Sequence, residues 1–125
     1  MTVHPLVGQL QAQGEAFVAL RRDLHQHPEL GLAEQRTSQL VAEQLSAWGY
    51  EVHRGLATTG VVGTLRRGQG TKRLALRADM DALPIHECSG KPWASVHAGV
   101  MHACGHDGHT AMLLAAARHL AEQGD

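Results

Sequence analysis

A long aperiodic stretch, residues 79–105, divides this sequence and limits the architectures open to it. It contains two prolines, three glycines and many polar side chains, and segments with clear helix or strand patterns lie on both sides of it. A connection of about 25 residues without regular structure is uncommon in a compact domain unless it is functional or disordered. We therefore expect residues 79–105 to carry function.

The flanking segments have the periodicity of helices and short strands. Apolar residues at helical spacing predict three helices, at about 6–27, at 32–48, and from near Asp107 through Leu120. Alternating apolar residues predict three strands, at 50–54, 60–65 and 73–78. Pro28 cannot continue the first helix, and Gly49 follows the second helix where a glycine is expected. This order predicts an α/β or α+β layout with the long loop leaving the end of a strand, where ligand sites in α/β sheets tend to lie.

Composition narrows the class of protein. The 125 residues fit one domain, and with only one Phe, one Tyr and two Trp the core must be built from Leu, Val and Ala. A formal charge of −1 argues against a nucleic-acid or membrane-surface partner. No apolar run approaches the ~20 residues that span a bilayer, and no signal peptide is visible, so we expect a cytoplasmic protein. Two cysteines do not suggest a disulfide scaffold.

The densest polar segment is MHACGHDGHT, residues 101–110. It places five candidate ligand side chains within eight positions: His102, Cys104, His106, Asp107 and His109. Thiolate and imidazole are favoured ligands of zinc and softer divalent ions, and the two glycines let the backbone turn tightly. A structural zinc site commonly uses four ligands in paired motifs, which this segment lacks, so we favour an open, catalytic site. Single histidines elsewhere, and Cys88, are interpreted as ordinary surface or core residues.

Two further segments carry weaker signals. Asp79 and Asp81 follow directly on the predicted strand 73–78, where a carboxylate could bind metal or orient a ligating histidine. A strand-ending turn with solvated acids is the alternative. In His25-Gln26-His27-Pro28-Glu29-Leu30, a histidine in the last turn of a helix complements the helix dipole, which is a sufficient structural explanation.

Three segments, in this order and spacing, resemble the M20 metallopeptidase family: RRDLHQHPEL (21–30), LRADMDALPI (76–85) and GVMHACGHDGHTAML (99–113). The resemblance is to the aminoacylase-like branch, which includes hippurate hydrolase and the IAA-amino acid hydrolases. It implies the N-terminal part of an α/β, mixed-sheet, helix-flanked catalytic domain that binds two divalent metal ions. The metals would be Zn²⁺ or Mn²⁺, with Co²⁺ or Ni²⁺ also open.

Carried over residue by residue, the resemblance assigns two metal ligands, Cys104 and His106. Asp79 matches the acid that supports the metal site in related members and is the catalytic residue that we predict. Arg77 stands where other branches have a ligating histidine, a departure that is usual in this branch. The resemblance leaves four nearby residues without a role: Asp81, His102, Asp107 and His109.

The implied activity is hydrolysis of the amide bond of a small-molecule N-acyl amino acid. The family's general base, a Glu in a Glu-Glu pair, its remaining ligands and its inserted dimerisation domain would all lie beyond Asp125. We therefore expect residues 1–125 to be the N-terminal part of the catalytic domain, inactive alone, of a protein that is a homodimer at full length. A non-catalytic metal-binding or degenerate module, and a thiol enzyme that uses Cys104 with a nearby histidine, are the alternatives.

Overall fold

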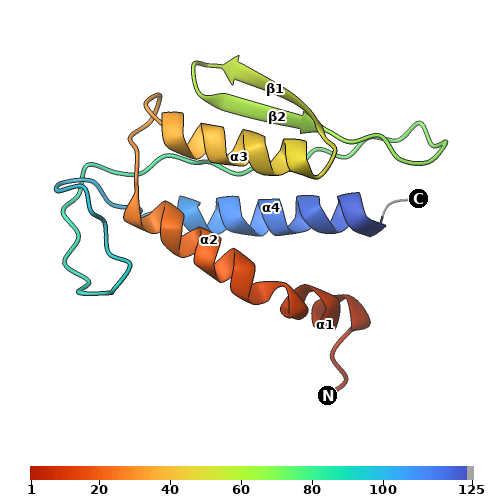
Figure 1. Cartoon of the computed structure of the whole chain (residues 1–125), viewed down its shortest axis with the longest axis horizontal. Coiled ribbons are helices and arrows are strands. Elements are labelled where there is room, and N and C mark those ends of the chain that lie inside the picture. The colour runs from red at the N-terminus through yellow and green to blue at the C-terminus, as the bar shows by residue number, and fades with distance from the viewer. Residues whose placement is uncertain (124–125) are drawn as a thin grey trace.

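The computed structural model describes residues 1–123; Gly124 and Asp125, which the predicted domain includes, lie outside the described residues. Four helices are present: α1 (Pro5–Ala12), α2 (Gly14–Gln26), α3 (Gln35–Ala47) and α4 (His106–Gln123). Two strands are present: β1 (Glu51–Leu56) and β2 (Gly60–Thr64). The β1–β2 hairpin packs on α3, and α4 lies between α3 and α2 (Figure 1). The chain thus combines helices with a small sheet, as the predicted α/β class requires.

The predicted single helix over residues 6–27 is wrong, because the chain forms two helices there. The break is at Gln13, whose backbone N–H donates to the Leu10 carbonyl at 3.1 Å. Glycine makes a helix interior less stable than ordinary residues do, and Gly8 and Gly14 lie on either side of the break. No residue of α1 is buried, so no packing keeps α1 in line with α2.

Helix α3 begins and ends close to its predicted bounds. Glu29 caps its start, because one carboxylate oxygen accepts the Thr37 N–H at 2.7 Å and the other accepts the Arg36 N–H at 2.9 Å. Gly49 follows the helix with a φ of +83°, a conformation that glycine adopts without a steric cost. The weak motif that contains Glu29 therefore marks both the end of one helix and the start of the next.

The sheet has two strands, where the sequence predicts three. Strands β1 and β2 pair antiparallel, with Glu51 opposite Thr64 and an irregularity between Arg54 and Leu56. The strand predicted at 73–78 is wrong, because that segment pairs with no strand in the described part of the chain. Leu74 is 81% exposed and Leu76 is 52% exposed. Apolar and polar residues alternate in this segment as they do in a strand with one buried face. No segment in the described part of the chain covers that face.

The core lies between α3 and α4. Its buried members are Val41 and Leu45 of α3 with Leu114 and Ala117 of α4, as expected for a core made of Leu, Val and Ala. Tyr50 adds a polar link, because its hydroxyl donates to the carbonyl of Ala117 at 2.7 Å. This packing fixes α4, and therefore the point at which the long loop enters α4. Among residues 1–123, no helix combines the length and the apolar character that crossing a membrane would need.

Residues 79–105 form no helix or strand, as predicted, and are held by isolated backbone bridges. The Ala82 N–H donates to the Glu29 carbonyl at 2.8 Å. Leu83 and Met101 exchange two backbone hydrogen bonds of 2.9 and 3.0 Å. The two ends of the loop are therefore tied to each other beside the first turn of α4, where the loop wraps in Figure 1.

Candidate metal centre

The loop enters α4 through a tight turn that separates the two predicted metal ligands. Cys104 carries a free, exposed thiol. Gly105 has a φ of +84°, and its carbonyl accepts the N–H of His109 at 3.0 Å in the first turn of the helix. His106 is the first residue of α4. The left-handed conformation of Gly105, which favours glycine, lets the chain turn from the thiol directly into the helix.

His106 is oriented by Asp81. Its Nδ1 lies 2.8 Å from the Asp81 carboxylate Oδ1 and 3.0 Å from the Asp81 carbonyl oxygen. A carbonyl oxygen and an ionised carboxylate can only accept, so Nδ1 is the donor in both contacts, and Nε2 is the nitrogen that can offer a lone pair to a metal. A carboxylate on the far nitrogen is the usual support of a metal-binding imidazole, since it fixes the ring and raises its basicity. The His106 side chain is 16% exposed, so the ring is held in place and still reachable.

Asp79 lies near this pair and does not join it. Its carboxylate accepts from Arg77 Nη2 at 2.7 Å, and its backbone carbonyl accepts from the Thr110 hydroxyl at 3.1 Å. The Asp79 side chain is 46% exposed and that of Arg77 is 87% exposed. The acid in contact with His106 is therefore Asp81, to which the family resemblance gave no role. The catalytic assignment of Asp79 stays a prediction.

His102 is buried behind the turn. It is 4% exposed, and neither ring nitrogen has a hydrogen-bond partner in the structure. Burial lowers the pKa of His102, the charges of His25 and His106 lower it further, and Asp107 and Asp81 oppose them. The ring is therefore held neutral, as a small polar group inside the fold.

A buried ion cluster, the His25 cluster, occupies the other side of the first turn of α4. It consists of Arg21, His25, Glu87, Ser95 and Asp107. His25 is 5% exposed; its Nδ1 lies 2.7 Å from Asp107 Oδ2 and its Nε2 lies 2.9 Å from Glu87 Oε1. Arg21 Nε donates to the same Asp107 oxygen at 2.8 Å, and the Ser95 N–H donates to Glu87 Oε1 at 3.0 Å.

Both acids of the His25 cluster, Asp107 and Glu87, are held in their ionised form. Burial raises the pKa of Asp107, but the hydrogen bonds from His25 and the Gly108 N–H, with the charge of Arg21, outweigh it and lower the pKa overall. Burial likewise raises the pKa of Glu87, and the hydrogen bonds from Ser89 and Ser95 with the His25 contact lower it by more. These donors keep two negative charges stable in a site that water hardly reaches.

Sequence reasoning missed the His25 cluster. It explained His25 by its place at the end of a helix, which is correct for the backbone and omits what the ring contacts. Glu87 and Asp107 lie 62 and 82 residues further along the chain, and no spacing rule connects such positions. Asp81 could have been found, because its two-residue spacing from Asp79 already offered two acids for the same task.

The donors at the turn suit a divalent metal as part of a ligand shell. Cys104 and His106 offer a thiolate and an oriented imidazole nitrogen, the donors that zinc and softer divalent ions favour. His109 has its ring centre 5.7 Å from that of His106 and is exposed. Within residues 1–123, no three His, Cys, Asp or Glu side chains are grouped so that they could hold a metal ion. The described residues therefore fit a metal as two ligands that need others to complete the shell.

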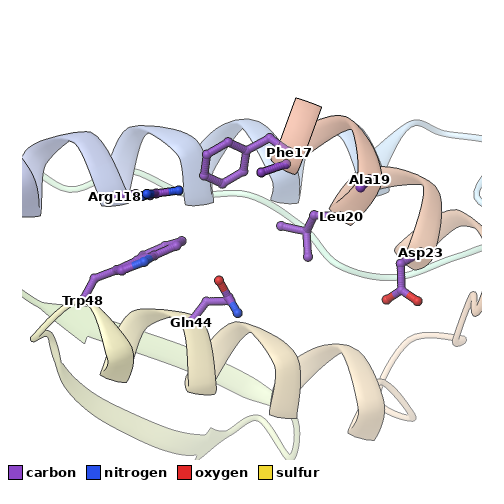
Figure 2. Close-up of a pocket in the computed structure, with 8 residues that line it drawn as sticks. Phe17, Ala19, Leu20, Asp23, Gln44, Trp48 and Arg118 are labelled. Carbon is purple, nitrogen blue, oxygen red and sulfur yellow. The ribbon is translucent and has the colours of Figure 1, made fainter. Parts of the chain in front are cut away.

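A groove between α2, α3 and α4 is a second concave feature, with a volume of 390 Å³ (Figure 2). Phe17, Leu20 and Trp48 line it with the polar side chains of Gln44 and Arg118. Arg118 lies twelve residues along α4 from His106, about 18 Å of helix. The groove contains none of the predicted ligands, which lie at the other end of α4.

Comparisons with known proteins agree with the resemblance predicted from the three motifs. Residues 75–125 match the model of peptidase family M20/M25/M40. The chain is 53% identical over 114 residues to a hippurate hydrolase of Campylobacter jejuni, covering 91% of this chain and 30% of that protein. It is 50% identical over 101 residues to an N-acyl-L-amino acid amidohydrolase of Geobacillus stearothermophilus, covering 81% of this chain and 27% of that protein.

The fold is also that of a solved structure. The Bacillus subtilis YXEP protein, described as a dinuclear metal binding peptidase from the M20 family, superimposes with a TM-score of 0.86 at 37% identity, covering 91% of this chain and 32% of that one. The chain spans about 30% of the length of the curated relatives it matches. The predicted resemblance and the predicted fold class are both confirmed.

Proposed function

We propose that this chain, a segment of M20 metallopeptidase type, is the N-terminal part of the catalytic domain of a metal-dependent amidohydrolase. The reaction would be hydrolysis of the amide bond of N-acyl amino acids. One observation carries the proposal: Asp81 holds Nδ1 of His106 and leaves Nε2 without a partner among residues 1–123, two residues along the chain from the exposed thiol of Cys104. Both residues lie in the segment that matches the family model.

The substrate class is supported by the names of the relatives. A hippurate hydrolase and an N-acyl-L-amino acid amidohydrolase are both named for amides of amino acids. The alignment with the hippurate hydrolase covers 91% of this chain and so includes the long loop and the first turn of α4. An amide of an amino acid is therefore the class of substrate that we propose, and the acyl group is left to measurement.

Each residue at the turn has a defined task in this proposal. Cys104, as the thiolate, and His106, through Nε2, would hold metal, and Asp81 keeps the His106 ring in the correct tautomer and orientation. A bound divalent ion supplies Lewis acidity toward the amide oxygen and toward water. We retain Asp79 as the predicted catalytic acid, with its carboxylate beside Arg77. Two ions are proposed because YXEP is described as dinuclear; Zn²⁺ or Mn²⁺ are the first candidates, then Co²⁺ or Ni²⁺.

The rest of the active site is proposed to lie in the part of the relatives that the chain does not span. Only two donors are in place at the turn, and a catalytic shell needs more. The further ligands, the general base and a dimerisation domain would come from that part, which makes a homodimer the proposed assembly. Residues 1–125 alone are expected to show no turnover. A cytoplasmic location remains a prediction from the sequence.

A non-catalytic metal-binding module is the second candidate, and the incomplete donor set is the observation that favours it. One experiment separates the two. The intact protein is purified, its metal content is measured, and hydrolysis of a panel of N-benzoyl and N-acetyl amino acids is followed before and after treatment with a chelator. Turnover that the chelator abolishes and Zn²⁺ or Mn²⁺ restores supports the enzyme. Stoichiometric metal with no turnover across the panel would favour the module.

A further inference from the structure

The ring of His25 has a carboxylate oxygen on each nitrogen, which fixes how many protons it carries. Nδ1 lies 2.7 Å from Asp107 Oδ2 and Nε2 lies 2.9 Å from Glu87 Oε1. A neutral imidazole has one N–H, so one of these contacts would set a nitrogen lone pair against a carboxylate oxygen. At such distances each contact needs a proton between the two atoms. The ring is therefore an imidazolium, unless one of the acids is protonated.

The other donors around the two acids favour the imidazolium. Asp107 Oδ2 also accepts from Arg21 Nε at 2.8 Å, and Glu87 Oε1 also accepts from the Ser95 N–H at 3.0 Å. Donors of this kind stabilise a carboxylate and compete with a proton on it. With two carboxylates, one imidazolium and the guanidinium of Arg21, whose side chain is 37% exposed, the charges of the His25 cluster balance, which lowers the cost of burying the acids.

The His25 cluster joins three segments that are distant in the sequence. His25 lies in the last turn of α2, Glu87 in the long loop, and Asp107 in the first turn of α4. The backbone adds to the link between α2 and the loop, because the Val96 N–H donates to the Gln26 carbonyl at 2.9 Å. Asp107 follows His106 directly. Whatever fixes Asp107 therefore fixes the direction from which His106 leaves the turn.

We propose that His25 is a positioning residue, an imidazolium that holds Glu87 and Asp107 together and so sets the placement of Cys104 and His106 for metal. The part of this inference that concerns metal rests on the proposed function, and the part that concerns the ring does not. His25 contacts neither Cys104 nor His106, so it acts through the backbone of the first turn of α4. Residues hydrogen-bonded directly to a metal ligand typically change metal affinity by about 10–100-fold, and the more remote His25 is expected at or below the lower end of that range.

The protonation state of the ring is tested without metal. The intact protein is labelled with ¹⁵N-histidine, and two-bond ¹H–¹⁵N correlation spectra are recorded on the metal-free form near neutral pH, with His25→Gln used to assign the signals. The inference expects both His25 nitrogens to carry protons. A ring with one proton-free nitrogen would overturn the imidazolium, whatever the metal chemistry of the protein.

The positioning role is tested with Co²⁺, whose charge-transfer absorption reports a thiolate ligand. His25→Gln should weaken Co²⁺ binding by up to about 10-fold and change the charge-transfer band, while His27→Gln should do neither. His27 is a matched control, because its Nδ1 bonds only within α2, to the Asp23 carbonyl at 2.8 Å and near the Asp23 carboxylate at 3.4 Å.

Should His25→Gln not fold, Glu87→Gln carries the same test, since it removes one of the two charges and keeps the shape of the side chain. Binding and spectrum equal to those of the unmodified protein, in a folded variant, would overturn the positioning role. Absence of a charge-transfer band in the unmodified protein would instead overturn the proposed metal site. The ring measurement would then stand by itself.

Discussion

The first turn of α4 separates two histidine–carboxylate pairs that differ in one respect. On the buried side, His25 meets Asp107 at 2.7 Å; on the open side, His106 meets Asp81 at 2.8 Å. Each contact involves Nδ1 of the ring. The difference lies at Nε2, which binds Glu87 in His25 and has no hydrogen-bond partner for His106 in the described part of the chain. The side chain of His25 is 7% exposed, whereas that of His106 is 16% exposed and follows an exposed thiol.

The comparison shows that the same two residue types can build a structural link or prepare a ligand. When both ring nitrogens face carboxylates, as in His25, the ring is proposed to be charged and joins segments. When one nitrogen is bonded to a carboxylate, the other is a correctly oriented lone pair. The adjacent residues His106 and Asp107 point to the two sides, so one helical turn couples the closed pair to the open one.

The largest expected effect comes from removing the thiol on the open side. Because residues that only support ligands already change metal affinity by about 10–100-fold, loss of a ligand through Cys104→Ala should cost more than about 100-fold. Metal content and hydrolysis of N-benzoylglycine by the intact protein measure this. Cys88→Ala is the matched control, since Cys88 is also free and exposed. Equal losses of metal content and activity in both variants would show that Cys104 is not a specific metal ligand.

The second effect concerns the carboxylate that holds His106. Asp81→Ala removes the acceptor at 2.8 Å, so Zn²⁺ affinity should fall by about 10–100-fold, as measured by competition with a chelating dye. Asp79→Ala is the partner variant, because its carboxylate pairs with Arg77 instead. We expect the smaller loss of affinity in Asp79→Ala. The reverse order would give the support of His106 to Asp79, as the sequence motif suggested.

These two acids illustrate how far the sequence alone could predict the structure. Spacing located α3, α4, the hairpin and the long loop, because those features depend on local pattern and turn residues. Local pattern also placed a strand at 73–78, where the structure has an unpaired segment with Leu74 81% exposed. Pairing is a long-range property that periodicity does not contain.

The candidate site was predicted to the same extent. Cys104 and His106 are recognisable because they lie two residues apart in one loop. The contacts that orient them come from Asp81, 25 residues earlier, and from His25, which meets Asp107 across 82 residues. Such contacts depend on how α2, the loop and α4 pack together. The assignment of Cys104 and His106 as ligands stays a prediction. The sequence offered Asp79 and Asp81 equally as support for a histidine, and only the packing distinguishes them.

The third effect is a pH dependence of the stability that Glu87 gives to the buried His25 side of the turn. The pKa of Glu87 is lowered from its ordinary 4.5, so the folded protein gives up this proton more readily than the unfolded chain does. The stabilisation by its carboxylate is complete above pH 4.5 and is lost as the pH falls below that value. Replacing a charged acceptor with a neutral one in Glu87→Gln should cost about 1–1.5 kcal/mol at neutral pH.

Thermal unfolding of both proteins without metal, from about pH 7 to about pH 3, measures this dependence. The gap in melting temperature between the unmodified protein and Glu87→Gln should be constant at the neutral end and narrow on the acid side. A gap that is unchanged at every pH would mean that the charge of Glu87 does not stabilise the fold. His27→Gln provides the baseline, because it leaves the His25 cluster intact.

The smallest effect is at the hinge between the open and closed pairs. Gly105 has a φ of +84°, and an added Cβ would meet no atom within 4 Å, so Gly105→Ala is strained by its backbone alone. That conformation costs an L-residue about 1 kcal/mol, and the melting temperature of the intact protein should fall by a few degrees.

Gly108→Ala is the matched control. Its added Cβ also meets no atom within 4 Å, Gly108 has no positive φ, and it lies inside α4, where alanine is the better residue. Opposite signs for the two variants would show that the turn, and not crowding around the helix, directs His106 to one side and Asp107 to the other. If Gly105→Ala were instead as stable as the unmodified protein, the turn could relax without a glycine. The link between the His25–Asp107 pair and the His106–Asp81 pair would then have to come from their side chains alone.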